Sequence, residues 1–366
     1  MFDHFKVPED IAVRVPLDRL RAATEAVFLK CGVPADDAAL GADALMFADL
    51  AGIDTHGVSN KLRDYAAKFQ SGVLNPTPNW TIVTETASTA VIDGDGGLGL
   101  LIAPKAMSIA MDKADKVGSG MVSIRNAGHA GAAGYHARLA LERDMIGWCM
   151  TVSSASKSML PTYGAEPLLG TNPIAFAAPA DKEAAFLFDA AMTTIAGNKI
   201  GLAKRMGKPL QGGWVAHADG TPDLEGGPIE KFSTEGKPNQ LPLGSTRELG
   251  SHKGYGMAMI VDILCGQLSF APGYSTLADD RGGHFVAAWD VAAFGEPSEF
   301  KRNMDGMLGR LRTSKPMAGA ERVYYAGLIE VETEQERRER GIPLHPEVVD
   351  WFRQACDEFD IPFDLA

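Results

Sequence analysis

The sequence predicts an α/β core with helical segments at its two ends. Three observations carry this prediction. Apolar residues at helical spacing dominate the start of the chain, strand-like and helix-like stretches alternate over residues 76–330, and an amphipathic helix closes the chain. With 366 residues, of which 45% are hydrophobic, the chain can bury a large core divided into two or three domains or subdomains.

The first elements are expected to be helices. An apolar stripe at helical spacing runs from Leu20 to Cys31. The acidic pair Asp36 and Asp37 suits the start of a second helix, because negative charge is favourable at a helix N-terminus. A third helix is expected over residues 58–70. The stretch "SGVLNPTPNW" then breaks the pattern and marks the first boundary.

Beyond this boundary the two kinds of element alternate. Strands are expected at "TIVTET", "TAVID", "GMVSIR", "MIGWCMTV", "NPIAFAAP" and "AAFLFDA", and helices at "APKAMSIAMDKADKV" and "AAGYHARLALERD". The stretch "KGYGMAMIVDILCGQLSF" predicts a long helix buried on most sides. The tail "TEQERRERG" indicates a charged, solvated segment before the closing helix "PEVVDWFRQACDEF".

Composition narrows the class of partner. The formal charge is -12 and no long basic cluster offsets it, which disfavours a nucleic-acid or membrane partner and favours a small-molecule substrate. The first residues lack a signal-peptide pattern and no apolar run is long enough for a bilayer, so we expect a cytoplasmic protein. The four cysteines are widely separated, which predicts neither a disulfide framework nor a structural zinc.

A literal G-x-G-x-x-G spans Gly94 to Gly99, after an apolar run and before a helix-like one. A Rossmann turn also needs an acidic residue at the end of the next strand, to bind the ribose hydroxyls. That strand ends instead in Arg125 and Asn126, and the helix is expected to begin late, near Pro104. An Arg there suits the phosphate of NADP, whereas a tight strand exit explains the same glycines without a cofactor.

Four residues are candidates for chemistry. His56 in "GIDTHGVSN" and His129 in "RNAGHAGAAGY" lie in loops of small residues that leave room for a ligand, and either imidazole could act as a general acid/base. The simpler interpretation is that each bonds only its own loop backbone. Asp189 ends an apolar strand and could fix a histidine tautomer or cap a turn. Lys253 at a helix start indicates a bound anion or a surface lysine.

Five motifs in this order, "GIDTHGVSN", "RNAGHAGAAGY", "GTNPIAFAAP", "FDAAMTT" and "SHKGYGMAM", resemble the type-2 malate/L-lactate dehydrogenase family. The resemblance implies an α/β, non-Rossmann NAD(P)-binding fold, in which the Gly94 turn is coincidental. It also implies a homodimer with active sites near the subunit interface. Residues 1–75 would form a helical segment that packs with residues 331–366, beside an α/β core over residues 76–330 with cofactor-binding and substrate-facing subdomains.

The same resemblance implies hydride transfer between NAD or NADP and C2 of a 2-hydroxy/2-oxo acid. His56 would exchange the substrate proton and Asp189 would hold its tautomer. His129 would contact the substrate or nicotinamide, although a catalytic role for His129 competes with this assignment. Contacts to the cofactor are expected from Gly170, Thr171, Asn172, Pro173, Ala190, Met192, Thr193, Thr194, Lys253, Gly254 and Gly327.

One departure concerns the substrate. Many family members carry an arginine four residues after the first histidine, and this chain has Asn60 there. Arg63, two helical turns beyond His56, is the expected carboxylate anchor, with Thr55 as a neighbouring contact and Lys157 as a second cation. Alternatives are a cyclic imino-acid reductase, a metal-dependent hydrolase that uses the histidines and Asp189 as ligands, or a metabolite-binding protein without turnover.

Overall fold

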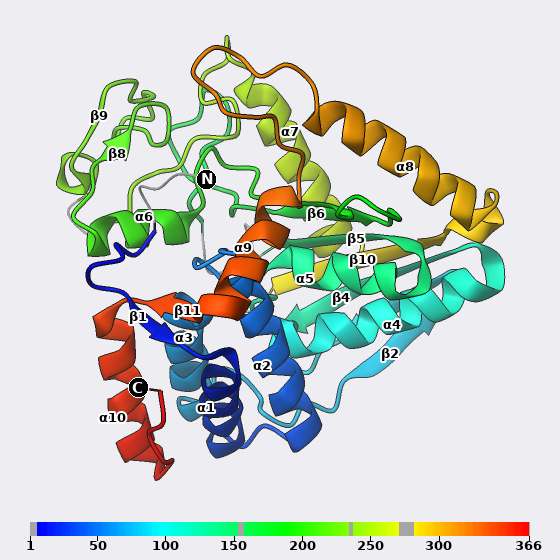
Figure 1. Ribbon diagram of the computed structural model, residues 1–366, viewed down its shortest axis with the longest axis horizontal. Coiled ribbons are helices and arrows are strands. Elements are labelled where there is room, and N and C mark those ends of the chain that lie inside the picture. The colour runs from blue at the N-terminus through cyan, green and yellow to red at the C-terminus, as the bar shows by residue number, and fades with distance from the viewer. Residues whose placement is uncertain (1–5, 153–156, 234–236, 271–281, 366) are drawn as a thin grey trace.

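The computed structural model describes residues 6–152, 157–233, 237–270 and 282–365. Its centre is a seven-stranded sheet with the order β2-β3-β4-β10-β5-β6-β7 (Figure 1). The strands are β2 (Thr81–Glu85), β3 (Thr89–Asp93), β4 (Ser119–Ala127), β5 (Met145–Val152), β6 (Ile174–Ala178), β7 (Phe186–Ala190) and β10 (Gly282–Asp290). β3 and β4 pair in parallel, and the other neighbours in this sheet are antiparallel. The sheet is therefore not the parallel Rossmann sheet.

The central strand β10 is the main element that sequence reasoning does not predict. It lies between β4 and β5, with Val286 opposite both Val122 and Cys149. The strand is buried over most of its length, so its sequence "HFVAAWD" lacks the apolar/polar alternation of a half-buried strand. A strand covered on both faces cannot be recognised by period alone.

Helices cover both faces of this sheet. α4 (Gly99–Val117) and α5 (Ala133–Arg138) pack in one cluster with Val286 and Ala288 of β10, whereas α7 (Ser251–Asp262) and the π-helical turn η4 (Ile263–Gln267) pack with Phe285 and Ala287. Alternate residues of a strand face opposite sides, so these helices lie on opposite faces. Figure 1 shows the same layering, with α4 and α7 separated by the strands.

Two expectations about these helices are wrong. α4 begins at Gly99, so Pro104 lies inside the helix and does not mark its start. The helix at α7 and η4 is not buried on most sides, because Met259 is 43%, Ile260 47% and Ile263 51% exposed. The apolar residues of this helix therefore lie partly in the core and partly at the surface of the protein.

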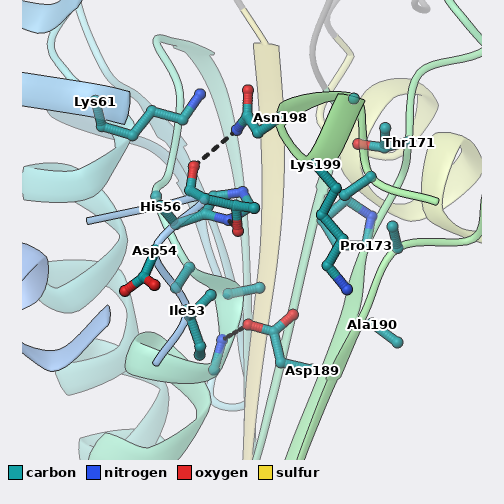
Figure 2. A pocket seen from close by; sticks show the side chains of 18 of the residues that line it. Ile53, Asp54, His56, Lys61, Thr171, Pro173, Asp189, Ala190, Asn198 and Lys199 are labelled. Atoms are coloured by element: carbon teal, nitrogen blue, oxygen red, sulfur yellow. Dashed lines mark hydrogen bonds between the residues drawn. The ribbon is translucent and has the colours of Figure 1, made fainter. Parts of the chain in front are cut away.

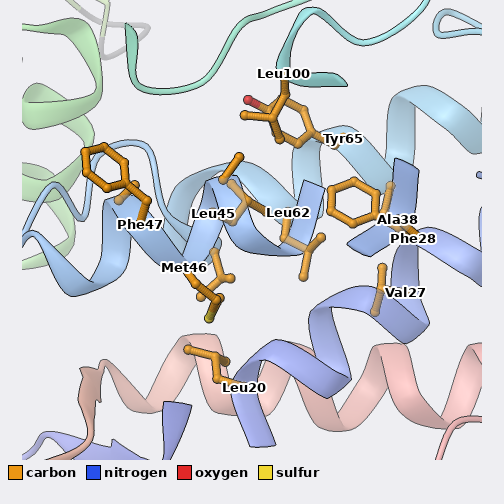
Figure 3. Packing of buried hydrophobic residues seen from close by; sticks show 14 of the residues in the cluster. Leu20, Val27, Phe28, Ala38, Leu45, Met46, Phe47, Leu62, Tyr65 and Leu100 are labelled. Carbon is orange, nitrogen blue, oxygen red and sulfur yellow. The ribbon is translucent and has the colours of Figure 1, made fainter. Parts of the chain in front are cut away.

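A helical region stands beside the sheet. It contains α1 (Leu17–Lys30), α2 (Ala35–Leu50), α3 (Val58–Gln70) and α10 (Pro346–Phe359), and β1 (Val13–Val15) pairs antiparallel with β11 (Ile342–Leu344). Figure 3 shows part of its core, where Leu20, Phe28 and Leu62 interdigitate. Complete burial of such side chains stabilises the fold by about 1.5–3 kcal/mol each. The two ends of the chain thus share one core.

The remaining elements surround the sheet. They are η2 (Leu139–Arg143), α6 (Gly197–Arg205), β8 (Leu210–Gln211), β9 (Gly226–Gly227), η3 (Ile229–Lys231), η6 (Val291–Ala293), α8 (Pro297–Arg312) and α9 (Leu328–Arg340). The tail "TEQERRERG" belongs to α9, and Arg337 within it is 4% exposed, so the expected solvated segment is wrong at this residue. Within the described residues, none of the helices combines the length and apolar character that a membrane span requires.

Candidate active site

A cavity of about 770 Å³ opens between the helical region and the β7 edge of the sheet. Its walls come from the loop between α2 and α3, from α3, from the loop after β4, from β7, from the N-terminal turn of α6 and from α9 (Figure 2). This volume lies within the range of small-molecule sites, and the site lies where several elements converge, as ligand sites commonly do.

The first wall is the loop that carries His56. Asp49, at the end of α2, accepts the N–H of Val58 at 2.8 Å and so fixes the start of α3. Thr55 Oγ1 lies 2.8 Å from His56 Nδ1, and Asn198 of α6 donates to the carbonyl oxygen of Thr55 at 2.9 Å. Since Thr55 engages Nδ1, Nε2 is the ring atom left for a substrate.

His129 faces His56 across the cavity. Its Nδ1 lies 2.7 Å from the Tyr65 hydroxyl and accepts the N–H of Gly131 at 3.0 Å. A backbone N–H can only donate, so Nδ1 carries no proton and the neutral ring is protonated at Nε2. The two imidazoles are stacked, with centroids 5.7 Å apart and planes 12° from parallel. The site therefore presents two imidazole edges side by side.

The glycine turn supports the His129 loop. The Leu100 N–H donates to the carbonyl oxygen of His129 at 3.0 Å, so a protein carbonyl occupies the start of α4. A Cβ on Gly99 would lie 2.3 Å from the Gly128 carbonyl oxygen and 2.4 Å from His284 Nε2. Residues 94–99 are not among the described residues that line the cavity. Close packing explains these glycines without a pyrophosphate.

Two buried histidines bond the carbonyl groups on either side of His129. His284 Nε2 donates to the Gly128 oxygen at 2.9 Å, with Thr151 Oγ1 on its Nδ1 at 2.7 Å, and His136 Nε2 donates to the Ala130 oxygen at 2.6 Å. Burial lowers the pKa of each of these two imidazoles to about 4. Both are therefore neutral donors that hold the loop at physiological pH.

The cavity histidines are neutral as well. Burial, followed by the positive charges of Lys61 and Lys199, lowers the pKa of His56 to about 3. Burial and Lys61 hold the pKa of His129 well below its ordinary value. With Nδ1 held by Thr55, neutral His56 presents Nε2 as a base, whereas neutral His129, with Nδ1 engaged by Tyr65 and Gly131, presents an Nε2–H donor.

Asp189 is the penultimate residue of β7 and lies in the cavity wall, but it does not bond His56. Its carboxylate accepts the N–H of Gly134 at 2.7 Å, and burial raises its pKa to about 6. Among the described residues, His56 and Asp189 share no hydrogen bond, so the direct contact expected for control of the tautomer is not formed. In this structure Thr55 takes the orienting position at His56 Nδ1.

The cavity brings together part of the expected set. The expected residues that line it are Thr55, His56, His129, Thr171, Pro173, Asp189, Ala190, Thr193 and Thr194. The expected residues outside the lining are Asn60, Arg63, Lys157, Gly170, Asn172, Met192, Lys253, Gly254 and Gly327. His56, His129 and Asp189 therefore line one cavity, whereas Lys253 and the predicted cationic anchors Arg63 and Lys157 do not.

The expected anchor Arg63 is exposed and lies outside the lining. Its assignment assumed that His56 and Arg63 share one helix, but α3 begins only at Val58, so two-turn spacing does not align them. Asn60 is also engaged elsewhere, because its side chain donates to the Asp54 carbonyl oxygen at 2.6 Å.

Other expected cofactor contacts support the wall from behind. The Asn172 side chain donates to the Ala258 oxygen of α7 at 2.9 Å, and Met192 is 1% exposed. Gly254 has no room for a side chain, since a Cβ would lie 2.4 Å from the Leu243 oxygen. Lys253 is exposed. Asn172, Met192 and Gly254 therefore pack behind the cavity wall, whereas Lys253 does not.

Several lining residues were not predicted as site residues, among them the polar side chains Lys61, Asn198 and Lys199. Lys61 shares a face of α3 with Asp64 and Lys68, and this charged stripe at helical spacing could have been found in the sequence. Within the described residues no group of three or more His, Cys, Asp or Glu is arranged to hold a metal ion.

Comparison with known proteins agrees along nearly the whole chain. The family described as Malate/L-lactate dehydrogenase matches residues 15–353. A malate dehydrogenase of Pyrococcus abyssi is 37% identical over 96% of this chain and 96% of its own. An L-sulfolactate dehydrogenase of Methanocaldococcus jannaschii is 34% identical over 92% and 94%. The crystal structure of malate dehydrogenase from Entamoeba histolytica superimposes with a TM-score of 0.90 at 34% identity, covering 96% of this chain and 99% of that one.

Proposed function

This chain belongs to the malate/L-lactate dehydrogenase family, and we propose on that premise that it is an NAD(P)-dependent oxidoreductase of 2-hydroxy acids. It transfers a hydride between the nicotinamide and C2 of a 2-hydroxy/2-oxo acid. The observation that carries the proposal is the stacked pair of neutral imidazoles in the cavity, in a chain that belongs to this family. One ring exchanges a proton with the substrate oxygen while the carbon exchanges a hydride.

The cavity fits a nicotinamide dinucleotide. The first turn of α6, with Gly197, Asn198 and Lys199, faces the cavity, and a helix N-terminus beside an amine suits a phosphate group. Thr171 and Thr193 line the same wall; the Thr193 hydroxyl donates to the Ile195 carbonyl oxygen at 2.7 Å, so Thr171 is the better candidate for a contact to ribose or amide groups. These residues would hold NAD(P), which supplies or accepts the hydride when bound.

His56 and His129 have different roles at the substrate oxygen. His56, neutral and with Nδ1 held by Thr55, accepts the hydroxyl proton in the oxidative direction and returns it in reduction. His129 donates its Nε2–H to the same oxygen, since its Nδ1 is engaged by Tyr65 and Gly131. Asp189 adds a carboxyl group that changes its charge near pH 6 within the same cavity.

We assign the substrate carboxylate to Lys61, in place of Arg63. Lys61 lines the cavity, and its charge lowers the pKa of both His56 and His129, so its field reaches the position of the substrate. Lys199 is a second cation acting on His56. Relatives named for malate and sulfolactate act on acids with two anionic groups, and Lys61 suits one of these groups.

The proposal includes a homodimer. Met259, Ile260, Ile263 and Leu268 leave an apolar surface of α7 and η4 exposed, at 43%, 47%, 51% and 46%. An exposed apolar patch of this kind marks an interface, and a second copy of this chain is the occupant we propose. Sedimentation velocity of the purified protein tests it: the expected species has twice the monomer mass, and Ile263→Glu should shift it to monomer.

The first test follows the absorbance of reduced nicotinamide. The purified protein is mixed with NADH or NADPH and a panel of 2-oxo monoacids, 2-oxo diacids and cyclic imino acids. Oxidation with the diacids supports the proposal and identifies the cofactor, whereas turnover of the cyclic imines alone would assign the enzyme to imine reduction. No turnover with any substrate, together with no saturable quenching of protein fluorescence by either cofactor, would refute the dehydrogenase function.

A further inference from the structure

An arginine near the C-terminus lies directly behind the His56 loop. Arg337 of α9 is 4% exposed, and its Nη1 donates to the main-chain oxygen of Asp49. The same guanidinium binds both carboxylate oxygens of Asp54, at 2.5 Å from Nη1 and 3.2 Å from Nη2. A planar guanidinium suits such a three-acceptor arrangement, because its donors are fixed in a fork. One side chain therefore joins the end of α2 to the loop before His56.

Further contacts also fix the backbone conformation of this loop. The Asp49 carboxyl holds the start of α3 through Val58, and a Cβ on Gly57 would lie 1.9 Å from Asp49 Oδ1, so the chain passes as close as glycine allows. The His56 N–H donates to the Ile53 oxygen at 2.8 Å. Asp49 therefore holds the loop at Gly57 and Val58, and Arg337 holds it at Asp54.

We propose that Arg337 is a positioning residue that holds the His56 loop in its catalytic conformation. The role rests on the function proposed above for His56. Arg337 does not line the cavity, whereas Ile329 and Glu330 on the same helix do. Any movement of α9 is therefore transmitted to the His56 loop through Asp54, and the cavity wall and the proton-transfer group move together.

The charged neighbours on α9 are the natural controls. Arg338 is paired with Glu334 one turn away, and its side chain is 52% exposed. Arg338→Gln removes the same charge from the same helix without touching the loop. Arg337→Gln removes the clamp, and Arg337→Lys keeps the charge but replaces the planar fork, whose two nitrogens reach Asp49 and Asp54, by a single nitrogen atom. The lysine variant also provides a folded protein if the glutamine variant does not fold.

The experiment measures kcat, KM, cofactor affinity and the titration of His56 in each variant. In Arg337→Gln we expect kcat to fall roughly 10²-fold with cofactor affinity unchanged, because a displacement of about 1 Å at a reacting group has an effect of that size. The lysine variant should recover part of kcat. By NMR, with His56 assigned from the signal lost in His56→Asn, the pKa of the imidazole should rise toward its ordinary value as water enters the loosened loop.

Two results would overturn the inference. One is an Arg337→Gln protein that melts at lower temperature yet keeps the kcat, KM and His56 titration of the wild type. The other is an equal loss of kcat in Arg338→Gln. If the wild type turns over no substrate, the proposed function fails, but the difference in His56 titration between wild type and variant still tests the clamp.

Discussion

The two loops that carry the cavity histidines are built by different chemistry. The loop of His129 is held by neutral groups: the N–H of Leu100, the buried imidazoles His136 and His284, and glycines that permit close packing. The loop of His56 is held by charged or ionisable groups, with Arg337 bound to Asp54 and with the carboxyl of Asp49 at the start of α3.

This difference has consequences for how each loop responds to change. Acid that protonates the buried imidazoles keeps their N–H donors but places a charge near the sheet, which destabilises the fold, whereas a buried ion pair is disrupted when one partner is removed. The supports of His129 also come mostly from nearby elements of the sheet layer. The supports of His56 come from α2, α6 and α9, which are far apart in the sequence, so the His56 loop depends on closure of the whole chain.

The largest expected effect distinguishes the roles of the two rings. His56→Asn should lower kcat roughly 10²–10⁴-fold, the usual contribution of positioned proton transfer. His129→Asn should lower it only about 10- to 100-fold, because it removes one hydrogen bond to a polar substrate group. Steady-state kinetics at saturating cofactor measures both. A larger loss in His129→Asn would exchange the proposed roles of the two loops.

The next effect concerns Lys61, the proposed anchor of the substrate carboxylate. Lys61→Met should raise KM for a 2-oxo acid about 10- to 100-fold, since hydrogen bonds to charged groups contribute about 1.5–3 kcal/mol. The exposed Arg63→Met is the matched control on the same helix and should leave KM near the wild-type value. If Arg63→Met raises KM and Lys61→Met does not, the carboxylate anchor is Arg63 and the assignment to Lys61 fails.

A third comparison tests how tightly each loop is packed. Gly57→Ala and Gly99→Ala would place a Cβ 1.9 Å from Asp49 Oδ1 and 2.3 Å from the Gly128 oxygen, and each should lower the free energy of unfolding by about 1–3 kcal/mol. Gly306→Ala, in the interior of α8 with nothing near its Cβ, should instead raise it by roughly 0.5–1 kcal/mol. Urea unfolding measures all three.

The last effect, confined to acid pH and small near neutral pH, is the acid sensitivity of the His129 loop. The folded pKa of His284, about 4, lies below the ordinary 6.5, so the unfolded chain binds the proton more tightly. This contribution to stability is complete above pH 6.5, declines as the pH falls, and amounts to a loss of about 3 kcal/mol at pH 4. Between pH 6.5 and 4 the free energy of unfolding should therefore depend less steeply on pH in His284→Asn than in the wild type. The difference in slope should correspond to at most one proton taken up on unfolding. An unchanged slope would show that His284 is not neutral in the folded protein.

Local patterns in the sequence are enough to predict many of the elements and both cavity histidines. The third helix is expected over residues 58–70, where α3 is found, because helical spacing and flanking glycines are local signals. His56, His129 and Asp189 are recognisable because small residues and strand ends mark loops that face ligands. The central strand β10 escapes this reasoning, because burial on both faces removes its alternation.

The sequence by itself determined the α/β class, the family and the residue types at the site, because composition, periodicity and ordered motifs are properties of short segments. Only the tertiary structure decided which cation lies near the histidines. Lys61 and Arg63 are two residues apart on α3 and point to different sides of the helix, and only the side of Lys61 faces the cavity. The tertiary structure also decided that Arg337 is buried behind His56. Contacts between distant segments depend on how the chain closes on itself, and no local pattern records that closure.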